Sequence, residues 1–424
     1  MTAVLNTSLR PMVSHVADRA SEGRFGQLIT HGTFYSAGSQ LSNVSVVLPF
    51  IFAGRGMAWL AALLYPAYCV GKAVGNSASP CILDWSRHNR HLVIAGTVAA
   101  MAVMVAFSAV VSTIGGVVPV ALLVTSALLG IGSGVSNIAF NDVASSRLSD
   151  GRRGDLLLGQ SAAGSLMATA VTLLVVPMLV HGDAFAQSLY LLWFGAAGLA
   201  VAGIAALFVG PVRVSTTVVR RTVQDTMRDG LHAARSQPWF RRYALTQLTF
   251  VPVSLGTTFY SLRAAQGQDK LPVLIVVSSV ALLAGSALWR AVYRAFGVRG
   301  MLMGSALMSA TAAAGCLAAE LLDVWSSAWV IAAVFLLVTM ANQAVYIASI
   351  TWVGLLADSC DRAALLGLGA ALVAIASCLT GAIIGDIAQD HSDSWPVMAM
   401  LVVSVAAVIV ARRAPSECVV GSNG

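Results

Sequence analysis

Long apolar runs alternate with short polar or charged loops along almost the whole sequence. Each run is about 20 residues or longer, the length of helix that crosses a hydrocarbon core of about 30 Å. We therefore predict an all-α polytopic membrane protein with twelve transmembrane helices. The predicted spans lie near 27–54, 57–79, 91–112, 117–142, 155–180, 186–210, 242–263, 270–289, 299–321, 325–352, 362–388 and 394–411.

Composition favours a membrane protein over a soluble one. Of the 424 residues, 58% are hydrophobic and 10% are charged, whereas about 25% charged residues is usual in soluble domains. A soluble fold keeps too much wet surface to hide so many apolar side chains. The formal charge of +7 does not indicate a nucleic-acid partner, because the basic residues lie in short loops, where they set topology.

A basic stretch at 211–242 divides the chain into two apolar halves and holds seven of the 25 Lys and Arg residues. Residues 1–25 are charged and lack the apolar core of a signal peptide. The predicted organisation is a cytoplasmic N-terminal tail at 1–26, a six-helix bundle at 27–210, a basic cytoplasmic connector at 211–241, a second six-helix bundle at 242–411 and a cytoplasmic C-terminal tail at 412–424.

Lys and Arg residues are distributed unevenly between alternate loops. With the N-terminus inside, 21 lie on the cytoplasmic side, three lie on the outer side, and Lys72 lies within a span. Cytoplasmic loops are enriched in basic residues. The bias predicts a multi-pass protein of the cell (inner or plasma) membrane with both termini in the cytoplasm.

The basic loops also repeat between the halves. The loop at 80–90 recurs at 290–299, and the loop at 143–154 recurs at 353–362. Two halves of like topology form a parallel repeat, related by an axis along the membrane normal.

The segment 80–92 resembles the loop between the second and third spans of the major facilitator superfamily, which reads roughly G-x-L-A-D-R-x-G-R-K-x-x-L. Asp84 and Leu92 match this pattern, whereas Trp85 and Arg87 replace its Arg and its second Gly. The resemblance implies a transporter fold of two six-helix bundles. Two features of the family's drug/proton antiporters are absent, namely a Gly-Pro motif in the fifth span and an Arg in the fourth.

Polar side chains gather on one face of the first, fourth, seventh and tenth predicted spans, which the resemblance implies line a central cavity. Lipid-facing helices exclude such groups, but helices that line a wet cavity hold them. The alternative is that these side chains bond helices to one another. The candidate substrate-binding residues are Tyr35, Ser39, Gln40, Asn43, Asn137, Asn141, Gln247, Ser254, Thr258, Asn342, Gln343 and Tyr346.

Lys72 and His31 lie within predicted spans and are our candidates for coupling transport to protons. A lysine at the centre of a span costs roughly 2.5–3.5 kcal/mol on insertion scales, so Lys72 is expected to have a use. It could pair with a carboxylate, contact an anionic substrate or titrate, or it could extend to the cytoplasmic surface. His31 could titrate near neutral pH, or it could simply be wet at the inner end of its span.

Charged residues near the inner ends of spans are candidates for a cytoplasmic gate, whose ion pairs would hold one conformation. The alternative is that they are solvated loop charges, each worth little. Glu320, Asp386 and Asp390 are expected in water near the outer ends. The candidate gate residues are Asp84, Arg87, Asp142, Arg147, Arg290 and Asp358.

Glycines and prolines predict where helices approach closely or bend. Gly130 with Gly134, and Gly381 with Gly385, place two glycines one turn apart, a spacing that permits backbone contact. Prolines remove a backbone donor and bend helices. Those within predicted spans include Pro66, Pro177 and Pro252.

These features favour a secondary active transporter without cofactor or metal. No P-loop, HExxH, GxSxG or CxxC motif occurs, so we predict no enzyme activity and no ATP-driven step, and we expect the cysteines to be unpaired. The predicted protein is a monomer that moves a small organic solute, neutral or amphiphilic, by alternating access. Efflux is favoured over uptake, and protons are a candidate coupling ion. The alternatives are an uptake permease or facilitator, a lipid flippase, and a non-transporting membrane sensor or scaffold.

Overall fold

Helices make up most of the chain that the computed structural model describes, which is residues 25–53, 58–114, 118–147, 150–180, 184–211, 223–264, 270–325, 327–357, 362–390 and 394–415. These residues contain no strand, so the all-α prediction is confirmed for them. The helices are the segment 25–41, α2 (Val47–Ala53), α3 (Ala58–Ser86), α4 (Arg90–Val111), α5 (Val118–Arg147), α6 (Asp150–Ala170), α7 (Val176–Leu179), α8 (Ala184–Leu207), α9 (Val223–Ser236), α10 (Pro238–Ala264), α11 (Leu271–Leu321), α12 (Ala328–Leu356), α13 (Arg362–Asp390) and α14 (Ser394–Ala411), with a 3-10 turn η1 (Arg87–Asn89) and a π-helical turn η2 (Val171–Val175).

Within the described residues, seven helices are long and apolar enough to cross a membrane, so the chain is a multi-pass membrane protein. They are Arg90–Val111, Pro119–Ala144, Gly159–Leu179, Phe185–Leu207, Leu271–Leu321, Ala328–Val353 and Leu365–Ile387. Helix α14 is also apolar but shorter. The segment 25–41 is too short for this set because the chain leaves the helix there, and α3 and α10 carry more polar residues.

Helix α11 joins two predicted spans, near 270–289 and 299–321, in one run of 51 residues. Inside it Gly297 has a φ of 63° and a ψ of −159°. A positive φ favours glycine because that residue has no Cβ atom. The run is therefore two helices that meet at a bend, which glycine makes possible.

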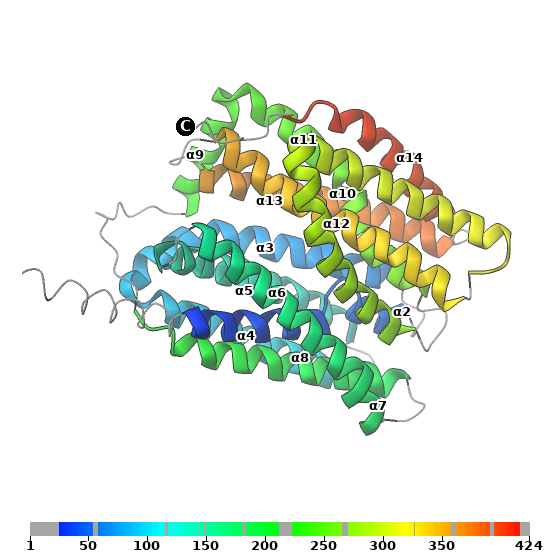
Figure 1. The fold of residues 1–424 in the computed structure, drawn as a ribbon, viewed down its shortest axis with the longest axis horizontal. Coiled ribbons are helices and arrows are strands. Elements are labelled where there is room, and N and C mark those ends of the chain that lie inside the picture. The colour runs from blue at the N-terminus through cyan, green and yellow to red at the C-terminus, as the bar shows by residue number, and fades with distance from the viewer. Residues whose placement is uncertain are drawn as a thin grey trace, which may run out of the picture.

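The helices pack in two groups, which lie one above the other in Figure 1. In the N-terminal group, α5 packs on α3 and α4, and α4 also packs on α8. In the C-terminal group, α11 packs on α12 and α14, and α10 packs on α12, α13 and α14. The groups meet where α3 packs on α13, α6 packs on α11, and α2 packs on α10. We call this contact the seam.

Helices α3 and α5 approach so closely that glycine is required where they cross. A Cβ atom at Gly130 of α5 would overlap the backbone carbonyl oxygen of Tyr68. A Cβ atom at Gly134 would lie 2.7 Å from the carbonyl oxygen of Lys72. The predicted close contact at these two glycines is confirmed, and it fixes the stretch of α3 that carries Tyr68 and Lys72.

Two glycines of α3 complete this contact from the other side. A Cβ atom at Gly71 would overlap the carbonyl oxygen of Ala127, and one at Gly75 would overlap that of Ile131. Glycines alternate between the helices, so each backbone fits against the other along two turns.

Helix α13 packs on the opposite side of α3, across the seam. A Cβ atom at Gly381 would lie 2.8 Å from Cγ of Pro66 and 3.2 Å from the carbonyl oxygen of Ala62. The close approach predicted at Gly381 is therefore confirmed, and Gly385 is buried on the same helix.

Prolines within helices lie beside irregular or buried backbone. Pro177 stands at the start of α7, directly after the π-helical turn η2. A π-helical turn is one way in which a helix accommodates a break in its hydrogen-bond ladder. Pro252 lies inside α10 and is buried.

The prediction of one continuous first span, 27–54, is wrong. The structure interrupts it at residues 42–46, between the segment 25–41 and α2. Oδ1 of Asn43 accepts hydrogen bonds from the amide N–H and the Oγ of Ser45, at 2.9 and 2.7 Å. The carbonyl oxygen of Asn43 accepts from the amides of Val46 and Val47. This Asx turn satisfies backbone groups that a broken helix would otherwise leave unpaired.

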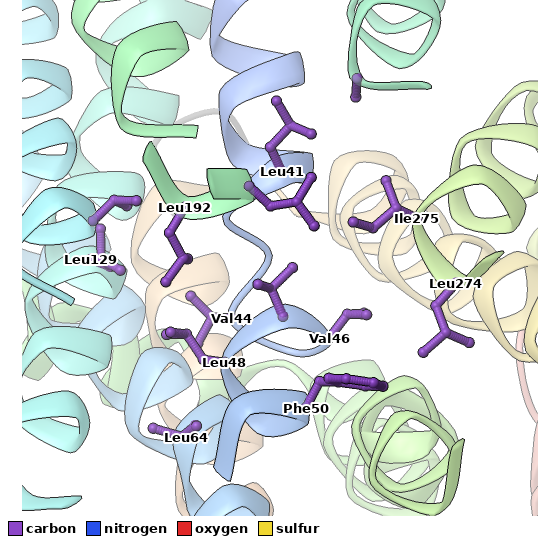
Figure 2. Packing of buried hydrophobic residues seen from close by; sticks show 14 of the residues in the cluster. Leu41, Val44, Val46, Leu48, Phe50, Leu64, Leu129, Leu192, Leu274 and Ile275 are labelled. Atoms are coloured by element: carbon purple, nitrogen blue, oxygen red, sulfur yellow. The ribbon is translucent and has the colours of Figure 1, made fainter. Parts of the chain in front are cut away.

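Apolar side chains beside the break pack toward both groups. Figure 2 shows Val44 and Leu48 on the side of Leu192, and Phe50 on the side of Leu274. All five side chains are buried in one apolar cluster. A continuous apolar core therefore crosses the seam at the end of the molecule that carries α2.

Part of the basic connector folds as helix α9, which the sequence analysis did not predict; residues 212–222 lie outside the described part. Helix α9 packs on α3, α10 and α13, so it contacts both groups at the end of the molecule opposite α2 (Figure 1). Ala233 is buried, whereas Arg228, Leu231 and Arg235 are exposed. The helix thus has one packed side and one basic, exposed side.

Glu320 keeps 31% of its side chain exposed, and it also forms an ion pair that the sequence analysis did not predict. Its Oε2 lies 3.0 Å from a guanidinium nitrogen of Arg263, whose side chain is 9% exposed. The guanidinium also lies 5.3 Å from the ring centroid of Trp325. Asp386 is exposed as expected, and the side chain of Asp390 lies outside the described residues.

The glycine contact between α3 and α5 can be tested by adding one methyl group. We expect Gly130→Ala to lower the free energy of unfolding by about 1–3 kcal/mol, because the new Cβ atom must push α3 away. Gly96→Ala is the matched control, since nothing lies within 4 Å of a Cβ atom there. The measurement is thermal unfolding in detergent by tryptophan fluorescence. Equal unfolding temperatures for the two variants would contradict the contact.

Candidate functional site

Two adjoining hollows lie between the groups beside the broken first helix. The first measures about 250 Å³ and is lined from both groups. The second measures about 330 Å³ and is lined mainly by the N-terminal group. Because they share lining residues, we treat them as one central cavity. The shared residues are Gln40, Asn43, Ser45, Tyr65 and Leu282.

The side chain of Gln40 connects the two groups across the seam. Its Nε2 donates hydrogen bonds to the Oγ of Ser165 on α6, at 2.9 Å, and to the Oγ of Ser36, at 3.3 Å. Its Oε1 accepts a hydrogen bond from the Oγ of Ser279 on α11, at 3.0 Å. Each bond offsets the cost of placing polar atoms away from water. Gln40 therefore helps to set how the groups meet at the cavity.

Tyrosines form the N-terminal wall of the cavity. Tyr35 and Tyr68 line the second hollow, and the hydroxyl of Tyr68 donates to the Oγ of Ser133 at 2.8 Å. Nδ2 of Asn137 donates to the same Oγ at 3.2 Å. Ser133 thus holds the ring of Tyr68 in place from behind, so the cavity presents aromatic faces as well as hydroxyl groups.

Lys72 turns into the seam, where its Nζ lies 4.9 Å from the ring centroid of Tyr346 on α12. Tyr35, Tyr68 and Cys69 lie close enough to interact with it electrostatically. Within the described part of the chain, its ammonium has no carboxylate partner and no hydrogen bond. The alternative that Lys72 extends to the cytoplasmic surface is wrong, because the side chain reaches the other group instead.

The C-terminal group contributes amides and hydroxyls to the first hollow. Nε2 of Gln343 donates to the Oγ of Ser286 at 2.9 Å and to the carbonyl oxygen of Leu282 at 3.2 Å. Asn342 lines the hollow and makes no hydrogen bond to another described residue. Its amide is therefore free to bond a solute, whereas that of Gln343 is partly engaged.

Five other predicted residues lie outside the lining of the cavity. Asn137 bonds Ser133 as described, and Asn141 is exposed toward the end of α5. Gln247 and Thr258 are buried in α10, and Ser254 is half-buried there. The three predicted residues of α10 therefore do not line the hollows, although Thr257 of the same helix lines the first. Substrate contact stays a prediction for every residue of the predicted set.

His31 is buried, with 3% of its surface exposed, so the alternative that it is wet is wrong. Its Nδ1 lies 2.8 Å from the carbonyl oxygen of Ala202 on α8, to which it donates. Its ring lies 5.3 Å from that of Phe140 and 6.0 Å from that of Tyr35. His31 therefore packs inside the N-terminal group, behind Tyr35, and does not line the cavity.

Two of the candidate gate residues that the structure describes, Asp142 and Arg147, belong to contacts within the N-terminal group. Asp142 forms a salt bridge with Arg90 of α4. Arg147 donates to the carbonyl oxygens of Gly210 and Pro211, at 2.7 and 2.8 Å, and thereby ties α5 to the end of α8. Arg290 is exposed. The remaining gate candidates have side chains outside the described part, namely Asp84, Arg87 and Asp358.

The sequence analysis missed Tyr65 and Tyr68 as cavity residues. With Lys72 they stand at positions i, i+3 and i+7, which share one face of a helix. This spacing was a usable signal, because it places a lysine beside two tyrosines. The serines at 165 and 279 carry no such signal, since single serines are common in membrane helices.

Solved structures of transporters share this fold. A variant of the nucleoside transporter NupG superposes with a TM-score of 0.70 and 12% identity, covering 92% of this chain and 99% of that one. A POT family transporter in complex with 5-aminolevulinic acid gives 0.65 at 9% identity, covering 92% and 94%. A D-xylose–proton symporter gives 0.64 at 14% identity, covering 95% and 98%. The chain has the fold of the major facilitator superfamily.

Sequence comparison then places the chain in a narrower family. It is 49% identical over 400 residues to the uncharacterized protein Rv2209 of Mycobacterium tuberculosis (strain ATCC 25618 / H37Rv), covering 94% of this chain and 78% of the relative. The uncharacterized protein Mb2232 of Mycobacterium bovis (strain ATCC BAA-935 / AF2122/97) matches to the same extent. The chain belongs to the family of these proteins. No protein-family model matches it.

The role of Asn43 in the broken helix can be separated from its place in the cavity. We expect Asn43→Ala to lower the free energy of unfolding by about 1–3 kcal/mol, because it leaves the amide of Ser45 unpaired. Asn342→Ala removes a cavity amide without a described hydrogen bond, so we expect a change within about 0.5 kcal/mol. Thermal unfolding of both purified variants measures the difference. Equal losses would show that Asn43 does not hold the turn.

Proposed function

We propose that this protein is a secondary transporter that moves a small organic solute by alternating access. Its two six-helix halves, 27–210 and 242–411, would rock about the central cavity, with the connector at 211–241 as tether. The proposed topology has twelve spans, with both termini in the cytoplasm. The proposed location is the inner or plasma membrane of the cell. The proposed working unit is a monomer.

The observation that carries this proposal is a polar cavity between two groups of helices in a multi-pass membrane protein. Side chains from both groups line it, and the bond from Ser279 to Gln40 crosses between them. Polar groups at membrane depth are expensive unless they serve a pathway or a partner. A non-helical turn is tolerated there where it lines a cavity, as the turn at Asn43 does.

The lining favours a neutral or amphiphilic solute. It consists of amides, hydroxyls, tyrosines and aliphatic side chains, and its described members carry no formal charge. The solved structures that share the fold include a nucleoside transporter and a D-xylose symporter. Nucleosides and pentoses are small polar molecules, in keeping with such a lining.

Direction and coupling belong to the same proposal. Efflux is preferred over uptake on the resemblance to the superfamily alone. Protons are the proposed coupling ion, with Lys72 and His31 as candidates. Of the two, Lys72 has the better position, because it contacts both groups, whereas His31 is enclosed in one.

Flux through reconstituted protein tests the proposed function. The assay is counterflow of radiolabelled adenosine, D-xylose and any further compound that stabilises the purified protein. We expect Gln40→Ala to reduce flux roughly tenfold or more, because about 1.4 kcal/mol of lost bonding is a factor of ten. The matched control is Thr311→Ala, an exposed residue whose hydroxyl bonds its own helix. If no stabilising compound moves across the membrane, the protein is a sensor or scaffold instead.

Cysteine labelling tests the proposed orientation. Cys81 is exposed near the end of α3 that we assign to the cytoplasm. In a variant that keeps it as the single cysteine, we expect a membrane-impermeant maleimide to label inverted vesicles and to spare right-side-out ones. A single-cysteine Thr113→Cys variant, at the exposed turn after α4, should give the opposite result. The reverse pattern at both sites would invert the topology.

A further inference from the structure

The positive charge of Lys72 lies beside the central cavity without an acidic side chain in the described lining. The described lining of the cavity carries amides and hydroxyls but no acidic or basic side chain. The rings of Tyr35, Tyr68 and Tyr346 belong to that lining, and all three lie near the ammonium of Lys72. Lys72 is not among the lining residues of either hollow, but a solute among these rings would have the positive charge of that lysine nearby and, from the described lining, no negative one.

The protein compensates this charge incompletely. A lysine at membrane depth is costly, and the cation–π contact with Tyr346 returns only part of that cost. An ammonium has three donors, and the described part of the chain supplies none of them with an acceptor. A charged residue in this position calls for a partner from outside the protein.

The surroundings of Lys72 also limit what that partner can be. The ammonium of Lys72 is a single, compact charge, whereas phosphate sites generally combine several donors, arginines or a helix N-terminus. One negative charge balances it, and a second would have no positive partner in the described lining. Beside it, Tyr65 and Tyr68 stack at 6.2 Å between ring centroids and offer flat faces at which a planar group can pack.

We propose that the solute is a planar or aromatic organic monoanion, whose carboxylate binds Lys72 while its ring lies against the tyrosines of the N-terminal wall. This inference rests on the proposed function and narrows the proposed amphiphilic solute to one that carries a single negative charge. Because Lys72 belongs to α3 and Tyr346 to α12, the carboxylate would bind where the two groups meet.

Matched acids and amides test the proposal. The probes are benzoate and indole-3-acetate, each compared with its amide, benzamide and indole-3-acetamide. Binding to purified wild-type protein is measured by thermal shift and by tryptophan fluorescence titration. We expect each acid to bind at least tenfold more tightly than its amide, and we expect Lys72→Gln to abolish that preference.

Two further variants keep the test decisive. Lys72→Arg retains the charge and should retain a preference for the acids, even if Lys72→Gln fails to fold. Arg412→Gln removes an exposed positive charge near the end of α14 and should leave the preference unchanged. Equal binding of acid and amide by the wild type, a preference that survives in Lys72→Gln, or no binding of either acid would each overturn the proposal.

Failure of this inference can be told apart from failure of the proposed function. Counterflow of adenosine or D-xylose without binding of the acids would support the proposed transporter and contradict the anionic solute. In the opposite case, the acids bind with the expected preference but labelled benzoate does not enter proteoliposomes. That result would support the anion site and contradict the proposed transport.

Discussion

The structure depends most on the way α3 is held by backbone contact on two sides. Gly130 and Gly134 of α5 leave no room for a side chain against one side, and Gly381 of α13 does the same against the other. Hydrocarbon supplies no hydrophobic force between helices, so such close packing is what stabilises them. These contacts set the rotation of α3 about its own axis in this arrangement, so the face that carries Tyr68 and Lys72 points toward the seam.

The second constraint is that polar groups at membrane depth must find partners in the protein. The break at 42–46 meets this constraint locally, since the side chain of Asn43 pairs the backbone that the helix abandons. Gln40, one turn earlier, meets it across the seam through Ser279. Lys72 has no such partner among the described residues, and this is why its surroundings differ from those of the other polar side chains.

Apolar length and loop charge predict the helices well, because hydrocarbon leaves the helix as the main way to pair a spanning backbone. The close helix contacts at the glycine pairs could also be predicted, since two glycines one turn apart permit backbone contact. The break at 42–46 was missed, because Asn43 also fits a polar stripe on a continuous helix. Pro49 was a usable signal, since a proline there removes the amide that would bond to the carbonyl of Ser45. The stripe of the first span does face the cavity, whereas the predicted stripe of α10 does not line it. Periodicity identifies a polar face, but the neighbouring helices decide what it faces.

The seam and the interiors of the groups differ in the strength of their polar contacts. The bond from Ser279 to Gln40 is worth about 0.5–1.5 kcal/mol, and the contact of Lys72 with Tyr346 about 0.5–2 kcal/mol. The two ion pairs of the described residues lie within single groups, one between α4 and α5 and one between α10 and α11. Breaking a partly buried ion pair leaves a charge uncompensated, which costs more than losing a neutral bond. The polar contacts are therefore weaker at the seam than within the groups, and apolar packing, above all that of α3 on α13, supplies the rest of the contact there. A ligand shifts an equilibrium between two arrangements of the groups by the difference in its affinity for them. A single charged or bidentate interaction with a solute supplies a few kcal/mol, enough to replace the polar cross-seam contacts. The packing of α3 on α13 across the seam must be exchanged as well.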